Sequence, residues 1–203
     1  MIDVPDITVS ALCFSYGKKT VFRDYSQFFR GPGVFLLTGA SGCGKTTLLR
    51  LIAGLEKPSS GSLSVSDPVA FAFQEYRLFP TIPALRNVSC VRQPKTKEEE
   101  KEYEEEALAL LGSIGLSRED AAKLPAELSG GMKQRVSLAR ALFSPHPIKL
   151  LDEVTKELDQ NSVSLVLDKI EEASRTSLIL FSTHRPEDCE RLETTRIELV
   201  SQN

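Results

Sequence analysis

The stretch Gly39-Ala40-Ser41-Gly42-Cys43-Gly44-Lys45-Thr46-Thr47 follows an apolar run, Val34–Leu37, and leads into a helix-forming run that continues to Ile52. Its glycines allow backbone N–H groups to turn toward an anion without clashes from Cβ atoms. A helix that starts near Lys45 adds free N–H groups and the positive end of its dipole. Lys45 offers an ammonium group to the β- and γ-phosphates, and Thr46 offers a hydroxyl group to Mg²⁺. The stretch therefore predicts a phosphate-binding loop for a nucleoside triphosphate.

The size and charge of the chain narrow the class of protein. A length of 203 residues fits one α/β domain with an inserted subdomain better than two independent domains. The formal net charge of −3 gives no support to a polyanionic partner, so we expect no nucleic-acid binding. No apolar run is long enough to cross a bilayer, and the first residues lack a signal-peptide pattern, so we expect a cytoplasmic chain. The scattered Cys13, Cys43, Cys90 and Cys189 are expected to be free thiols.

Alternating and apolar runs predict the order of the secondary structure. Strands are expected at 7–17, 21–29, 34–37, 62–65, 69–73, 148–151, 177–183 and 196–200, and helices at 46–55, 84–91, 95–112, 129–142, 162–174 and after His184. The first two strands predict an antiparallel hairpin. The later alternation of helix and strand predicts an α/β fold with a mainly parallel sheet flanked by helices. We expect a single domain over 1–203, with a helical subdomain inserted at about 75–143.

Several predicted strands end at polar residues, and ligands bind beyond the carboxyl ends of such strands. The strand 148–151 runs into Asp152-Glu153, a carboxylate pair that packing does not explain. Asp152 would hold Mg²⁺, and Glu153 would act on the water that attacks the γ-phosphate. A solvent-facing turn is the alternative for this pair. Gln74 and His184 also stand at strand ends, but alone neither carries a clear signal.

A second anion-binding helix end is predicted in the stretch Leu128–Arg135. Ser129 is a good N-cap, and Gly130 and Gly131 leave the helix start uncrowded, so an anion could approach its N–H groups. One nucleotide cannot use two phosphate-binding helix ends in one fold. We therefore expect a second copy of the chain, with each copy offering Ser129, Gly130 and Gly131 to the triphosphate of the other.

Taken together, these motifs resemble the ATP-binding cassette ATPases, the nucleotide-binding subunits of ABC transporters, over essentially the whole chain. The matching motifs are Walker A at Gly39–Thr47, the signature at Leu128–Arg135, Walker B at Ile148–Asp152 with Glu153, the Q-loop at Gln74 and the H-loop at His184. The resemblance implies that ATP and Mg²⁺ are the cofactors. Tyr16, which alone favours a packing role, is implied to stack on adenine.

The resemblance also implies the other residue roles. Nucleotide contacts are implied for Gly39, Ala40, Ser41, Gly42, Cys43, Gly44, Lys45, Thr46, Thr47, Ser129, Gly130 and Gly131, and metal contacts for Thr46, Gln74 and Asp152. Glu153 is implied to be the catalytic carboxylate, His184 the γ-phosphate contact, and Gln74 the sensor of Mg²⁺ and the attacking water.

The same resemblance implies the partners of the chain. Two cassettes would close head to tail over two ATP and drive a separate membrane permease, which would contact the region 78–85. The chain would lie on the inner face of the membrane, with an extracytoplasmic solute-binding protein as an indirect partner. Residues Phe73–Pro80 and Gly131–Arg135 are similar to importers of nitrate, sulfonate or taurine.

One loop departs from the family pattern. After Glu153 the family usually has Pro-Thr-Ser-Ala-Leu-Asp, whereas this chain has Val-Thr-Lys-Glu-Leu-Asp, which places the charges of Lys156 and Glu157 near the expected dimer interface. These charges are expected to weaken the closure of a homodimer or to favour a particular partner. Two alternatives to the transport ATPase stay open: a soluble cassette protein outside transport, and a nucleotide-binding module with impaired hydrolysis.

Overall fold

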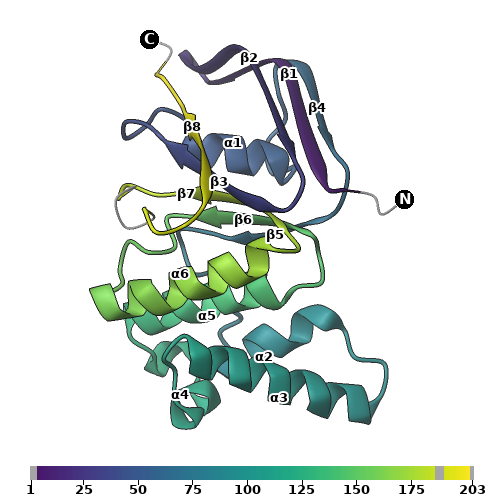
Figure 1. Ribbon diagram of the computed structural model, residues 1–203, viewed down its shortest axis with the longest axis vertical. Coiled ribbons are helices and arrows are strands. Elements are labelled where there is room, and N and C mark those ends of the chain that lie inside the picture. Colours follow the sequence, from purple (N-terminus) through teal and green to yellow (C-terminus); the bar gives the residue numbers. More distant parts are fainter. Residues whose placement is uncertain (1–3, 186–189, 202–203) are drawn as a thin grey trace. The chain divides into compact units, whose positions relative to one another are not determined.

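The computed structural model describes residues 4–185 and 190–201 (Figure 1). The chain forms two compact units. Unit 1 consists of Met1–Phe71, His146–Asp152 and Ser174–Asn203, and unit 2 consists of Ala72–Pro145 and Glu153–Ala173. The polypeptide passes between the units four times, and one of these crossings is the bond between Asp152 and Glu153.

Unit 1 contains a three-stranded antiparallel sheet. Its strands are β1 (Asp6–Tyr16), β2 (Lys19–Arg30) and β4 (Ser60–Val65), in the order β2-β1-β4 (Figure 1). Strands β1 and β2 form the predicted antiparallel hairpin, in which Tyr16 lies opposite Lys19 next to the turn. Most apolar side chains of this sheet belong to the buried core of the unit, whereas Phe28 on β2 is exposed.

The second sheet of the structure has five strands, in the order β5-β6-β7-β3-β8. These strands are β3 (Gly33–Thr38), β5 (Val69–Ala72), β6 (Ile148–Asp152), β7 (Leu178–Ser182) and β8 (Thr194–Glu198). Strand β3 pairs in parallel with both β7 and β8, and β6 pairs in parallel with β7. Every residue of β6 and β7 is buried, as expected for parallel strands covered on both faces. The prediction of a mainly parallel sheet is confirmed.

Helix α1 (Lys45–Ile52) follows β3 and packs on this sheet. Its apolar residues lie in one cluster with residues of β6 and β7: Leu48, Leu49, Leu51, Ile52, Ile148, Leu150, Leu178 and Leu180. Burial of such side chains contributes roughly 1.5–3 kcal/mol each relative to leaving them exposed in water. The start of α1 is thereby fixed at the carboxyl end of β3.

Unit 2 is helical. Its elements are α2 (Ala84–Ser89), η1 (Cys90–Arg92), α3 (Lys97–Ser113), α4 (Arg118–Ala122), η2 (Pro125–Glu127), α5 (Gly130–Phe143) and α6 (Gln160–Ser174), whose last residue belongs to unit 1. The guanidinium group of Arg86 on α2 lies 2.5 Å from Glu100 and 2.7 Å from Glu104 on α3. Glu100 and Glu104, from the acidic run of α3, thus tie α3 to α2.

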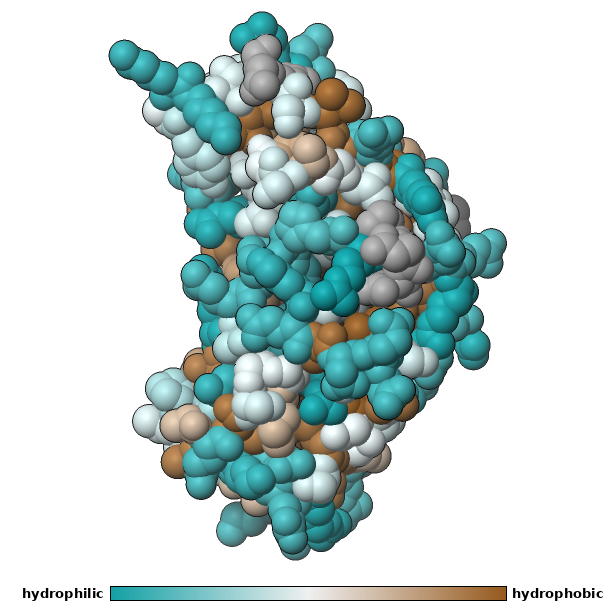
Figure 2. Space-filling model, turned by 90° about the vertical axis from the view of Figure 1, so that its left-hand side faces the viewer, coloured by the Kyte–Doolittle hydropathy of each residue, from teal (hydrophilic) through white to brown (hydrophobic). Residues whose placement is uncertain are grey.

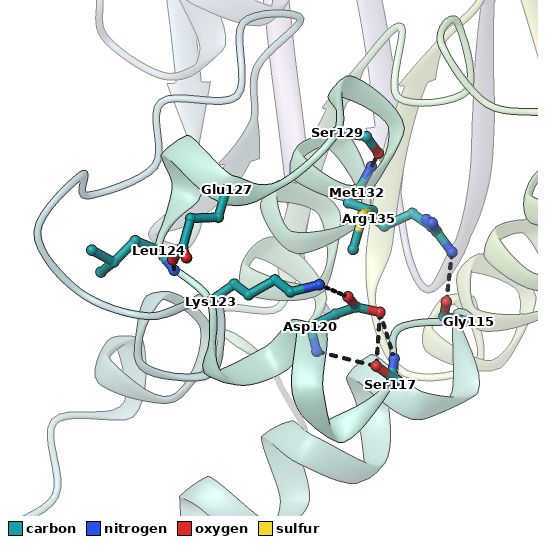
Figure 3. Close-up of polar contacts among 9 residues, drawn as sticks. All are labelled: Gly115, Ser117, Asp120, Lys123, Leu124, Glu127, Ser129, Met132 and Arg135. Carbon is teal, nitrogen blue, oxygen red and sulfur yellow. Dashed lines mark hydrogen bonds and ion pairs between the residues drawn. The ribbon is translucent and has the colours of Figure 1, made fainter.

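The structure differs from the predicted elements in several places; helix α1, for example, ends at Ile52 rather than at 55. Helix α4 was not expected, because its five residues are too few to show an apolar period; a capping box between Ser117 and Asp120 starts it instead (Figure 3). The last strand is Thr194–Glu198 rather than 196–200. The helix expected after His184 falls largely on residues 186–189, which lie outside the described residues, and residues 190–193 form a turn and a bend.

The predictions on free thiols and on membrane-spanning segments can be checked within residues 4–185 and 190–201. Cys13, Cys43 and Cys90 are free thiols, and Cys189 lies outside the described residues. Within the described ranges we find no helix whose length and apolarity suffice for a membrane crossing. On the face drawn in Figure 2, hydrophobic residues form small separate patches among hydrophilic ones.

We predict that Gly44→Ala destabilises the protein more than Gly54→Ala. Both glycines have positive φ, +111° and +69°, which costs an alanine about 1–2 kcal/mol. A Cβ on Gly44 would also lie 2.8 Å from Phe22 Cζ and 2.9 Å from Val21 Cγ1, whereas a Cβ on Gly54 meets nothing within 4 Å. Overpacking adds roughly 1–3 kcal/mol. Urea unfolding measures both variants, and equal losses would contradict the packing of β2 on the loop before α1.

Candidate functional site

The loop between β3 and α1 presents unused backbone donors. The N–H of Cys43 donates to the carbonyl of Ala40 at 3.2 Å and closes a turn that leaves Ala40, Ser41 and Gly42 exposed. Gly44 occupies the N-cap position of α1 without any side-chain cap, and the first turn of α1 has no acidic residue. The N–H groups at this helix start are therefore available to an anion.

Gly39 holds the loop against the end of the chain's last described strand. Its φ is +135°, and a Cβ there would lie 2.3 Å from the carbonyl oxygen of Leu199 and 2.8 Å from Cys43 Sγ. The backbone of Leu199 is fixed in turn, because its N–H donates to the carbonyl of Thr38 at 2.9 Å. The close approach of these two segments requires glycine at position 39.

The Lys45 ammonium group lies inside the loop. Lys45 is 5% exposed, and Nζ donates to the carbonyl oxygens of Gly39 at 2.7 Å and Ala40 at 3.2 Å. A buried charge is costly unless hydrogen bonds and an opposite charge compensate it. The carbonyl groups supply the hydrogen bonds, and a phosphate group bound by the loop would supply the opposite charge.

Asp152 connects three elements at one edge of the sheet. Its Oδ1 accepts hydrogen bonds from Thr46 Oγ1 at 3.1 Å and from Ser182 Oγ at 2.6 Å. Asp152 and Ser182 are register partners at the ends of β6 and β7, and both are buried. Hydroxyl and carboxylate oxygens are ligands that Mg²⁺ accepts beside substrate phosphates, so Thr46 and Asp152 fit the predicted metal role. Ser182 was missed in the sequence, although its place at a strand end was a usable signal.

Tyr16 and His184 are the other predicted site residues in unit 1. Tyr16 is 47% exposed, and its ring meets Phe14 at a right angle with 4.8 Å between ring centroids. Its hydroxyl donates to Glu56 Oε1 at 3.3 Å, and Arg50 pairs with the same oxygen at 3.1 Å. His184 is exposed two residues beyond β7, the strand beside β3. Tyr16 thus offers a solvent-exposed aromatic ring held at its hydroxyl end.

Unit 2 brings Gln74 and Glu153 to one cavity. The cavity has a volume of about 490 Å³ and is lined by Gln74, Glu75, Tyr76, Gln134, Glu153, Lys156 and Glu157. Glu153 is 8% exposed and has a φ of +51°, a left-handed conformation that is unfavourable for a residue with a Cβ. Its Oε2 lies 3.3 Å from Lys156 Nζ. The unusual Lys156 therefore pairs with the carboxylate that was predicted to be catalytic.

The start of α5 is ordered by polar contacts (Figure 3). Ser129 Oγ accepts a hydrogen bond from the N–H of Met132 at 3.3 Å, which confirms the predicted N-cap. Arg135 donates to the carbonyls of Ile114 and Gly115, both at 2.9 Å, and holds α5 to the end of α3. Ser129 is exposed, so the helix start is open to solvent at this residue.

The carboxylate of Glu157 also lies at this helix start, which was not expected from the sequence. A Cβ on Gly130 would lie 2.7 Å from Glu157 Oε2 and 3.1 Å from the Tyr76 hydroxyl oxygen. The Tyr76 hydroxyl donates a hydrogen bond to Glu157. This hydrogen bond, together with burial, raises the pKa of Tyr76 to about 12. The expected uncrowded anion site thus has an acidic neighbour from its own unit.

Comparison with known proteins adds the family. A family model described as ABC transporter matches residues 27–156. The thiamine import ATP-binding protein ThiQ of Brucella abortus is 35% identical over 207 residues, which cover 96% of this chain and 84% of ThiQ. The chain belongs to the ABC transporter family. Its cofactors are therefore ATP and Mg²⁺, in agreement with the loop and the Thr46–Asp152 pair.

Other members of the ABC transporter family match parts of the cassette. The aliphatic sulfonates import ATP-binding protein SsuB of Corynebacterium glutamicum is 45% identical over 155 residues, covering 76% of this chain and 63% of SsuB. The Fe(3+) ions import ATP-binding protein FbpC 1 of Rhizobium meliloti is 40% identical over 161 residues, covering 73% of this chain and 44% of FbpC 1. This chain thus spans less than half the length of the iron relative.

Solved structures confirm the fold of the cassette. The ATP-binding cassette MJ0796, in a dimeric post-hydrolysis state bound to ADP and Pi, matches with a TM-score of 0.82 at 24% identity. The match covers 95% of this chain and 96% of that chain. At this level of identity the similarity establishes the P-loop cassette fold alone.

We predict that Glu157→Ala lowers the pKa of Tyr76 from about 12 toward its ordinary value near 10, because the acceptor of its hydroxyl proton is lost. In the wild type the raised pKa stabilises the folded state below about pH 10, and this contribution is lost as the pH rises through about 12. Tyrosine absorbance at 295 nm measures the titration, and Tyr76→Phe assigns it. Glu75→Gln is the control, and an identical titration of Glu157→Ala and wild type would exclude the contact.

Proposed function

We propose that the chain hydrolyses ATP as the cassette subunit of an ABC importer and drives a separate membrane permease. The observation that carries this proposal is the arrangement at the end of β3, where Lys45 lies at the uncapped start of α1 and Thr46 shares a hydrogen bond with Asp152. These groups combine phosphate donors with oxygen ligands for a metal. A turn with a purely structural role would not require both phosphate-binding groups and metal ligands.

In this proposal the residues of the loop bind the triphosphate. The backbone N–H groups of Gly39–Thr47 and the Lys45 ammonium group hold the β- and γ-phosphates. Thr46 and Asp152 hold the metal, with Gln74 as a further contact. Bound Mg²⁺ would neutralise charge on the phosphate oxygens and hold them in place. Tyr16 provides the stacking surface for adenine.

The hydrolytic step is assigned to three further residues. Glu153 positions the attacking water and accepts its proton, which follows from its carboxylate chemistry and its place directly after Asp152. Gln74 orients the same water. His184, beyond the strand beside β3, donates to the γ-phosphate. The cavity shared by Gln74 and Glu153 within unit 2 supports this division of roles.

Two cassettes are proposed to close head to tail, each offering Ser129, Gly130 and Gly131 to the nucleotide of the other. The exposed Ser129 supports this, and solved cassettes of the same fold are described as dimeric. We further propose one cassette domain over 1–203, with a helical insert at about 75–143. The permease would hold the chain at the inner face of the membrane, with a solute-binding protein outside.

The relatives support import of a small solute. SsuB is named for aliphatic sulfonates, ThiQ for thiamine and FbpC 1 for Fe(3+) ions. All three names describe import ATP-binding proteins, which favours transport over a cassette protein outside transport. The 45% identity with SsuB supports the sulfonate group within the proposed importers.

A second candidate function is nucleotide binding with impaired hydrolysis. The ion pair between Lys156 and Glu153 favours it, because an ammonium group 3.3 Å from the carboxylate competes with water for the same oxygen atom. Turnover measurements distinguish the two candidates. A wild-type chain that binds ATP but releases no phosphate, alone or with its permease, would support the second candidate.

We predict that Glu153→Gln retains ATP binding but loses at least about a hundredfold in phosphate release, since it removes a general base. Lys45→Ala should lose ATP binding itself. Equilibrium binding and phosphate release are measured separately, on the chain alone and on the complex with the permease. Glu98→Gln, on an exposed position of α3, is the matched control. Wild-type turnover in Glu153→Gln would contradict the assigned role.

A further inference from the structure

A second lysine lies beside the phosphate loop, although it is outside every motif of the family resemblance. Lys19 begins β2, directly after the turn at Gly17 and Lys18. Its Nζ lies 3.9 Å from the position that a Cβ on Gly42 would occupy. Gly42 belongs to the exposed outer part of the loop, whereas Lys45 is buried inside it. Two ammonium groups therefore approach the loop from different sides.

The packing of β2 on the loop fixes the position of Lys19. Further along this strand, Val21 and Phe22 would meet a Cβ on Gly44 at 2.9 and 2.8 Å. Lys19 is also the register partner of Tyr16 across the hairpin. Directly opposite residues of an antiparallel pair project from the same face of the sheet. The proposed adenine surface and the Lys19 ammonium group thus share one face of the hairpin.

The charge on Lys19 is available to a ligand. Lys19 is exposed, and among the described residues it takes part in none of the ion pairs, which involve other lysines and arginines. The chain carries a net charge of −3, so positive potential at a phosphate site has to come from nearby residues. Lys45 supplies one such charge, and its buried ammonium group already donates to two carbonyls.

We infer that Lys19 is a second phosphate-binding lysine of this cassette, contacting the bound triphosphate from the solvent side of the loop. The inference rests on the proposed function, because it requires that the loop binds a nucleotide. The group that it contacts is phosphate rather than the base. Loss of the Lys19 charge is therefore expected to weaken the binding of ATP and of inorganic tripolyphosphate alike. The expected loss of affinity is about three- to tenfold, as for a solvent-accessible charged contact.

The test measures the dissociation constants of Mg-ATP and Mg-tripolyphosphate by calorimetry on the full chain. Lys19→Gln is expected to raise the dissociation constants of both ligands about three- to tenfold. This loss of affinity should become smaller as the salt concentration rises. Lys19→Arg should bind within twofold of the wild type. The control Lys18→Gln, which removes one positive charge from the exposed turn next to Lys19, should also bind both ligands within about twofold of the wild type. Thermal unfolding checks that the variants are folded.

The outcomes separate this inference from the proposed function. Equal affinities for Lys19→Gln and Lys18→Gln would overturn the role of Lys19 while ATP binding by the wild type stands. A lower affinity of Lys19→Gln for ATP with an unchanged affinity for tripolyphosphate would also overturn it, since the contact would then involve the base. No binding of ATP by the wild type would overturn both proposals.

Discussion

The parallel pairing of β3 with β7, and of β7 with β6, is the constraint on which the rest of the site depends. It brings the carboxyl ends of three strands to one edge, where Asp152 and Ser182 face each other in register. The chain leaves β3 at this edge through the loop 39–44 and returns as α1. Lys45 and Thr46 are therefore placed by backbone hydrogen bonding within a buried sheet rather than by flexible side chains.

The parts of the fold that the sequence predicted are those with local signals. Apolar runs that end at glycine or carboxylates marked β3 and β6, and Ser129 before two glycines marked the start of α5. Helix α4 was not predicted, because a capping box starts it and its sequence has no apolar period. The last strand was placed two residues late because the polar Thr194 and Thr195 gave no apolar signal, whereas pairing with β3 includes them.

The parts of the site that were missed depend on contacts between distant residues. Ser182 gains its importance from register with Asp152, and Lys19 from the packing of β2 on the loop. The hydrogen bond between Tyr76 and Glu157 joins residues 81 positions apart. The sequence did identify Glu157 as a departure from the family, but only the structure shows its carboxylate beside Gly130. Such relations carry no local pattern in a single sequence.

In the proposed function, the backbone N–H groups of the loop and of the start of α1 bind the phosphates of ATP. Hydrogen exchange of these amides, measured with and without saturating Mg-ATP, tests it most directly. Slower exchange is expected across residues 40–47, with no change at residues 64–66, which lie beside the start of β1, at the other end of this strand from Tyr16. Unchanged exchange at 40–47 in the presence of saturating Mg-ATP would contradict it.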